Sequence, residues 1–173
     1  MKRLTLLFVF IAILFASIGA YFGLKKFTPA QPTNAAVAAL MASTLPDAKN
    51  QSHQLTEWQG KTLLVNFWAT WCPPCVEEMP ELDALQTEMA AKNLQIIGIG
   101  IDSPSNIKEF ASKYKISYPL LIAGMNGTEL ARQFGNAGGG LPFTVLISPN
   151  GEIKKTYLGR LDMSIVREDL QKQ

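Results

Sequence analysis

Two cysteines lie three positions apart in the segment Cys72-Pro73-Pro74-Cys75. They follow an apolar run at residues 63–68 and open a segment with helical spacing at residues 74–92. A thiol at the start of a helix lies beside unpaired backbone N–H groups and the positive end of the helix dipole, which favours the thiolate. Cys75, one turn further on, is close enough to attack a mixed disulfide formed at Cys72. The spacing therefore indicates thiol–disulfide exchange, with Cys72 as the nucleophile and Cys75 as the resolving thiol.

The same pair of cysteines has three other interpretations. It could form half of a zinc site, or hold Cu(I) through soft thiolates and deliver it to a client protein. A structural zinc site needs about four ligands, whereas the chain has 2 cysteines and 1 histidine, His53. A purely structural disulfide is the third interpretation, but a loop this short removes little entropy from the unfolded chain. Redox chemistry is favoured, and we expect neither a resident metal nor a cofactor.

The residues around the cysteine pair show strand and helix patterns in alternation. Residues 63–68 and 94–101 are apolar runs of strand length, typical of strands that are covered on both faces. Between them, apolar residues recur at intervals of three and four, which predicts a helix. Further patterns predict helices at 105–114, 127–134 and about 164–172, and a hairpin of strands at 143–148 and 152–158. Together they predict an α/β domain in which helices flank a mixed central sheet.

The N-terminal region carries an uncharged apolar run. Residues 4–24 hold no charged side chain, close to the roughly 20 residues that a helix needs to cross a bilayer. A single-pass anchor competes with a cleaved signal peptide, for which residues 16–20 offer small side chains. The run continues beyond the usual cleavage distance, which favours the anchor. We divide the chain into an anchor or signal (1–27), a tether (28–42) whose alanine-rich part is either a helical turn or disordered, and a folded domain (43–173).

The net charge of +2 comes from the N-terminal region. Residues 1–27 hold four basic side chains and no acidic one, so the remaining 12 basic residues face 14 acidic ones. No basic surface for nucleic acid is therefore expected. A hydrophobic content of 47% with 17% charged residues is typical of a globular protein and argues against a disordered chain.

A family resemblance rests on two motifs. The stretch at 67–80 contains Trp-Cys-Pro-Pro-Cys at 71–75 and Glu-Met-Pro at 78–80, and Gly-Leu-Pro-Phe-Thr follows at 140–144 before a strand. From about residue 43 to its end the chain resembles the thioredoxin superfamily, and within it the membrane-anchored TlpA/ResA/CcmG-like thiol-disulfide oxidoreductases of the bacterial envelope. The resemblance implies a thioredoxin-like fold with an insertion at about 102–134. It also implies that Pro142 is a cis-proline facing the disulfide, and that Leu141 offers backbone groups to an extended substrate. Trp71 and Pro73, beside the cysteines, are also expected to contact substrate.

Glu78 lies three residues after Cys75 and so on the same helical face. By the resemblance it matches the active-site glutamate of the ResA-like branch, whose role would be to handle the proton of Cys75. Thioredoxin carries a buried aspartate six residues before its first cysteine, but this chain has Asn66 there, which cannot accept a proton. If a carboxylate must deprotonate Cys75, Glu78 is the nearest by sequence. The alternative is that Glu78 is a surface acid near the start of the helix, like Glu77 and Glu81.

These observations favour a membrane-tethered enzyme that reduces disulfides of exported proteins, such as apocytochrome c. The resemblance implies a catalytic domain on the periplasmic or other extracytoplasmic side of the bacterial inner membrane. It also implies an inner-membrane electron donor of the DsbD/CcdA kind. The motifs do not fix the direction of electron flow, because an envelope oxidase or isomerase would share them.

Overall fold

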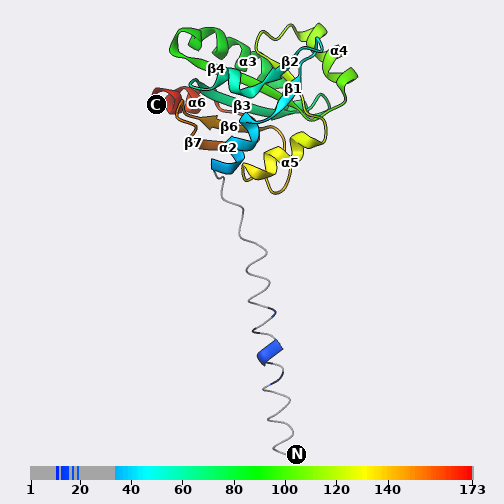
Figure 1. Cartoon of the computed structure of the whole chain (residues 1–173), viewed down its shortest axis with the longest axis vertical. Coiled ribbons are helices and arrows are strands. Elements are labelled where there is room, and N and C mark those ends of the chain that lie inside the picture. The colour runs from blue at the N-terminus through cyan, green and yellow to red at the C-terminus, as the bar shows by residue number, and fades with distance from the viewer. Residues whose placement is uncertain (1–10, 12, 16, 18, 20–33, 173) are drawn as a thin grey trace, which may run out of the picture.

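A computed structural model describes residues 11, 13–15, 17, 19 and 34–172 of the chain (Figure 1). Between residues 34 and 172, short 3-10 turns and helices connect and cover the strands. In chain order the elements are α2 (Asn34–Met41), β1 (Thr44–Pro46), β2 (Ser52–Gln54), η1 (Leu55–Trp58), β3 (Thr62–Trp68), α3 (Pro73–Met89), η2 (Ala90–Lys92), β4 (Leu94–Gly100), α4 (Pro104–Tyr114), β5 (Leu120–Ile122), α5 (Asn126–Gln133), β6 (Phe143–Ile147), β7 (Ile153–Leu158) and α6 (Met163–Gln171).

A five-stranded sheet in the order β5-β4-β3-β6-β7 forms the centre of the domain. The strand before the cysteines, β3, is buried along its whole length. It pairs in parallel with β4 and antiparallel with β6, so the sheet is mixed as the sequence predicted. The crossover from β3 through α3 to β4 is the strand, helix, strand unit expected around the cysteine pair.

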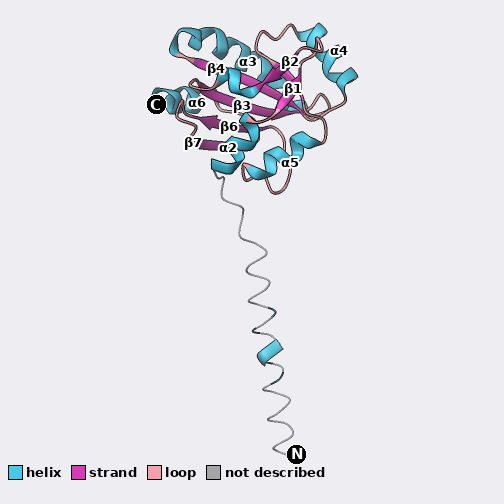
Figure 2. Ribbon diagram, in the orientation of Figure 1, coloured by secondary structure: helices cyan, strands magenta, loops and turns pink. Residues whose placement is uncertain are grey.

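Side chains of the sheet alternate between two apolar layers. Leu64 and Trp68 of β3 pack with residues of α3, α4 and α6, whereas Val65 and Phe67 pack with α2, η1 and α5. Figure 2 shows the strands between these helices, with α3 and α4 above and α2 and α5 below. The cysteines belong to the layer that contains α3, so the chemistry lies against one defined face of the sheet.

The structure adds elements that the sequence patterns did not resolve. The alanine-rich segment forms the helix α2, which buries Ala36, Val37 and Leu40 against the core and places the start of the packed domain before residue 43. The hairpin β1–β2 was not predicted, because each strand has only three residues. The segment expected to be an insertion, 102–134, contains α4, α5 and the edge strand β5.

The apolar run at residues 4–24 lies largely outside the described residues. Within the part of the chain that the structure describes, no helix combines the length and the apolar character needed to span a bilayer.

Candidate active site

Cys72 and Cys75 form a disulfide at the point where β3 gives way to α3. Cys72 is the N-cap of α3, and its carbonyl oxygen accepts hydrogen bonds from the backbone N–H groups of Cys75 and Val76. Pro73 and Pro74 occupy the first turn, where a missing N–H leaves no helical bond unmade. The structure therefore places Cys72 at the positive end of the helix, where its thiolate is favoured once the disulfide is reduced.

The two sulfur-bearing residues differ in access to solvent. Cys72 retains 4% of its surface and Cys75 none, whereas the adjoining Trp71 is 66% exposed and Pro73 is also exposed. An attacking partner can reach the disulfide only at its Cys72 end. Cys72 is therefore the more accessible end of the disulfide and Cys75 the fully buried end.

The segment before β6 approaches the disulfide from the neighbouring strand. The Leu141–Pro142 peptide bond is cis, which is the conformation that the resemblance implied. Because Phe143 pairs with Phe67, residue 142 lies level with Trp68, at the end of the sheet from which the chain leaves β3 for the cysteines. The fold thus brings Pro142 and the cysteine pair to the same end of two neighbouring central strands, although they are far apart in sequence.

Glu78 is fully buried on α3, whereas its neighbours Glu77 and Glu81 are exposed and pair with Arg160. Its carboxylate accepts two hydrogen bonds, one at each oxygen. Asn66 donates from Nδ2 to Oε1 at 2.7 Å, and the backbone N–H of Leu161 donates to Oε2 at 2.9 Å. Glu78 is therefore not one more surface acid of the helix.

Burial raises the pKa of Glu78 to about 7, because the ionised carboxylate loses hydration. The hydrogen bonds from Leu161 and Asn66 and the charge of Arg160 lower this pKa, and Glu81 raises it, but burial has the largest effect. Glu78 stands one helical turn from Cys75, at the i+3 spacing that brings side chains together. A carboxyl group with a pKa near neutrality can both accept and return a proton there.

Sequence reasoning missed the groups that hold Glu78. It treated Asn66 only as a residue unable to accept a proton, whereas Asn66 donates to both Glu78 and, at 3.0 Å, the Oγ1 of Thr144. Thr144 is the register partner of Asn66 across β3 and β6, a pairing that the Gly-Leu-Pro-Phe-Thr motif did not reveal. Leu161 contributes through its backbone, and no side-chain pattern signals such a role.

An apolar groove adjoins the exposed end of the disulfide. It measures about 560 Å³ and is lined by Trp71 and Leu141 together with residues of the segment 101–104, the exposed Met125 just before α5, and Thr128 of α5. At its edge, Asp102 accepts hydrogen bonds from the backbone N–H and hydroxyl of Thr70, which fixes the loop that carries Trp71. Burial raises the pKa of Asp102, but hydrogen bonds from Thr70, Ser103 and Asn106 together outweigh it and lower the pKa overall. The predicted substrate contacts Trp71 and Leu141 thus share one surface.

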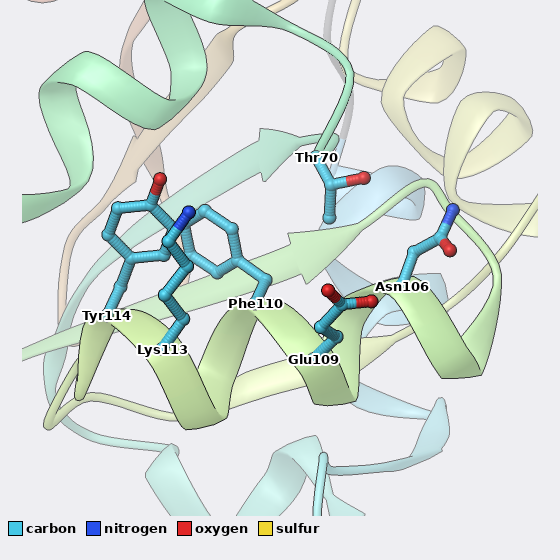
Figure 3. A pocket seen from close by; sticks show the side chains of 6 residues that line it. All are labelled: Thr70, Asn106, Glu109, Phe110, Lys113 and Tyr114. Atoms are coloured by element: carbon cyan, nitrogen blue, oxygen red, sulfur yellow. The ribbon is translucent and has the colours of Figure 1, made fainter.

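A second hollow, of about 370 Å³, runs along α4 beside Thr70. In Figure 3 the rings of Phe110 and Tyr114 lie side by side with the Lys113 chain, and Glu109 lies further along the helix. Phe110 also packs on Trp68, with ring centroids 4.7 Å apart. Phe110 and Trp68 belong to the same apolar layer as the two cysteines.

No cluster of three or more His, Cys, Asp or Glu side chains suited to a metal occurs among the described residues. His53, the single histidine, bonds to Asp47 and Glu57 beside the β1–β2 hairpin. It therefore takes part in the hairpin and not in the cysteine site.

The fold and the site together define a thiol-disulfide oxidoreductase of the thioredoxin superfamily. The Redoxin family matches residues 28–170, and the chain belongs to this family. It is 29% identical over 172 residues to the thiol-disulfide oxidoreductase ResA of Geobacillus thermodenitrificans, covering 98% of this chain and 95% of the relative. It is 33% identical over 128 residues to ResA of Halalkalibacterium halodurans, covering 73% of this chain and 70% of the relative.

A solved structure supports the same assignment. The thiol:disulfide interchange protein of the thioredoxin family from Chlorobium tepidum superposes with a TM-score of 0.65 at 26% identity, covering 75% of this chain and 91% of that protein. The predicted TlpA/ResA/CcmG-like membership and enzyme class are therefore confirmed.

Proposed function

We propose that the protein reduces disulfides of exported proteins, with Cys72 attacking the client, Cys75 resolving the mixed disulfide and Glu78 accepting the proton of Cys75. The observation that carries this proposal is the buried Glu78 carboxyl group, one helical turn from the buried Cys75 and with a pKa of about 7. A buried thiol has no water to take its proton, so it needs a base of this kind nearby.

The proposed exchange proceeds in two displacements. The Cys72 thiolate attacks one sulfur of the client disulfide, a mixed disulfide forms and the first client thiolate leaves. Cys75 then gives its proton to Glu78 and attacks the Cys72 sulfur, and the second client thiolate leaves. The client gains two electrons and two thiols, and the enzyme is left with the Cys72–Cys75 disulfide. The two client thiolates take up protons from solvent, and Glu78 releases its proton to solvent. The Cys72–Cys75 disulfide must then be reduced by an electron donor before the next cycle.

The proposal extends to location and partners. An uncharged run of 21 residues at 4–24, flanked by basic residues, supports a single-pass inner-membrane tether with the catalytic domain outside the cytoplasm. An enzyme that reduces clients there must itself be reduced, for which we propose an inner-membrane donor of the DsbD/CcdA kind. Apocytochrome c is the proposed client, as the resemblance to the TlpA/ResA/CcmG-like proteins implied.

Capture of clients tests the proposed roles of the cysteines. Cys75→Ser cannot resolve the mixed disulfide, so exported clients should accumulate as covalent adducts at Cys72, identified by mass spectrometry after non-reducing electrophoresis. The double variant Cys72→Ser/Cys75→Ser is the control and should capture none. Trp71→Ala removes an exposed wall of the groove, so in the Cys75→Ser background it should reduce capture without changing stability. Equal capture by Cys75→Ser and the double variant would contradict the proposal.

The reduction potential tests the direction of electron flow. The purified protein is equilibrated in glutathione or dithiothreitol buffers, and its redox state is followed by tryptophan fluorescence, since Trp68 packs in the same layer as the disulfide. A value near −270 mV, about that of thioredoxin, is expected for a reductant. A value near −120 mV, about that of a strong oxidant, would make the protein an envelope oxidase or isomerase instead.

A further inference from the structure

The hydrogen bonds around Glu78 suit only one of its two charge states. Asn66 Nδ2 donates to Glu78 Oε1 at 2.7 Å, and the Leu161 N–H donates to Oε2 at 2.9 Å. An ionised carboxylate accepts both bonds. A protonated carboxyl group carries an O–H that needs an acceptor, and both of these neighbours present N–H groups to it. A buried donor without an acceptor is costly, so this arrangement opposes the proton that the proposed mechanism delivers.

An acceptor is nevertheless present on the same side chain. Asn66 is fully buried, and its Oδ1 has no hydrogen-bond partner within the part of the chain that the structure describes. The second bond of Nδ2 goes to Thr144 Oγ1 at 3.0 Å. A hydroxyl can donate as well as accept, so Thr144 can also serve an amide oxygen placed where the nitrogen now lies.

We propose that the side-chain amide of Asn66 turns over when Glu78 is protonated, and that Asn66 is thereby a positioning residue for the proton of Cys75. A rotation of about 180° around the last side-chain bond exchanges Oδ1 and Nδ2 while keeping the amide plane. Oδ1 then accepts from the Glu78 O–H and from the Thr144 hydroxyl. Asn66 makes two hydrogen bonds in each state, through Nδ2 before the turn and through Oδ1 after it, and among the described residues the other end of the amide is without a partner each time. The turn therefore gives up two N–H bonds at Asn66 and gains a bond for the Glu78 O–H, while Leu161 donates to Oε2 in both states. This inference rests on the proposed role of Glu78.

The turning amide gives a reason for asparagine at this position. An aspartate at residue 66 would place a second carboxylate against Glu78, and two carboxylates so close cannot both ionise. A neutral amide serves either charge state without adding a charge. The other charged or titratable groups that act on this site are Arg160, Glu81 and the buried Tyr118. None of these three described residues hydrogen-bonds to Glu78, whose two bonds come from Asn66 and Leu161.

Nuclear magnetic resonance of the full-length oxidised protein tests the rotation directly. The Glu78 carboxyl ¹³C shift reports its titration, and Overhauser contacts of the Asn66 amide protons report the direction of the amide. Above the Glu78 midpoint, these protons should lie close to Glu78 and Thr144. Below it, both contacts should weaken together with the same midpoint. Contacts that stay unchanged through the titration would overturn the proposal, and this measurement needs no variant.

A variant supplies a second readout. Asn66→Leu removes the donor to the ionised state and the acceptor to the protonated state together, so the acid dissociation constant of Glu78 should change by less than about tenfold. An amide fixed as a donor stabilises only the ionised state, and its loss would lower that constant by about tenfold or more, which would contradict the proposal. Thr144→Val is the matched control and should change it little, since Thr144 bonds to Asn66 in both states.

The test of the amide and the test of the proposed function can fail separately. The rotation is measured in oxidised protein without any client, whereas capture by Cys75→Ser depends on the cysteines. Fixed amide contacts alongside normal capture would refute only the role of Asn66. A turning amide in a protein that captures no client would refute the reductase function and leave the rotation standing.

Discussion

Replacing Glu78 with glutamine should change how the stability of the protein depends on pH. The substitution keeps the shape of the side chain and removes its titration. Glu78 is fully buried, and burial raises its pKa to about 7 from an ordinary value of 4.5. The folded protein therefore holds this proton more tightly than the unfolded chain does.

The size and the sign of the effect follow from these two pKa values. The proton on Glu78 stabilises the folded state fully below pH 4.5, and this contribution is lost as the pH rises through about 7. The difference between the two values corresponds to about 3 kcal/mol of unfolding free energy. The glutamine variant stays neutral throughout. Relative to the wild type, it should therefore gain about 3 kcal/mol between pH 4 and pH 9.

Urea unfolding of the oxidised protein, followed by tryptophan fluorescence at several pH values, measures this difference. Comparing the two proteins at each pH cancels the titration of all other groups. Glu129→Gln, on the exposed face of α5 with 66% of its side chain accessible, is the matched control and should parallel the wild type. If the Glu78→Gln and wild-type curves also run parallel, Glu78 does not have a raised pKa and its proposed role as a base near neutrality is refuted.

Two further substitutions have defined outcomes. Arg160→Ala removes a positive charge that lowers the pKa of Glu78. The midpoint of the pH–rate profile for client reduction should therefore move to higher pH. An unchanged midpoint would show that Arg160 does not act on Glu78. Gly100→Ala places a methyl group against the Cδ1 of Ile107 in the layer under the disulfide, and should lower the unfolding free energy by about 1–3 kcal/mol. Gly138→Ala, where a methyl group meets open space, is its control, and equal stability of the two variants would contradict this packing argument.

The sequence predicted a strand or helix correctly where the apolar pattern within that element was long enough to identify it. The apolar runs predicted β3 and β4 because strands covered on both faces must be apolar throughout. The helix after the cysteines followed from the spacing of its buried residues. The short strands β1 and β2 were missed, because three residues carry too little periodicity to separate a strand from a loop.

The cysteine pair at a helix start, the mixed α/β domain and the family could all be predicted from the sequence. The burial of Glu78, in contrast to the exposed Glu77 and Glu81, follows only from how the folded chain packs. The tertiary structure also decided which groups bond to Glu78, since Asn66 and Leu161 lie 12 and 83 positions away in the chain. The physical reason is that a pKa depends on burial and on hydrogen bonds from several elements, and their meeting is set by the packing of α3 on the sheet.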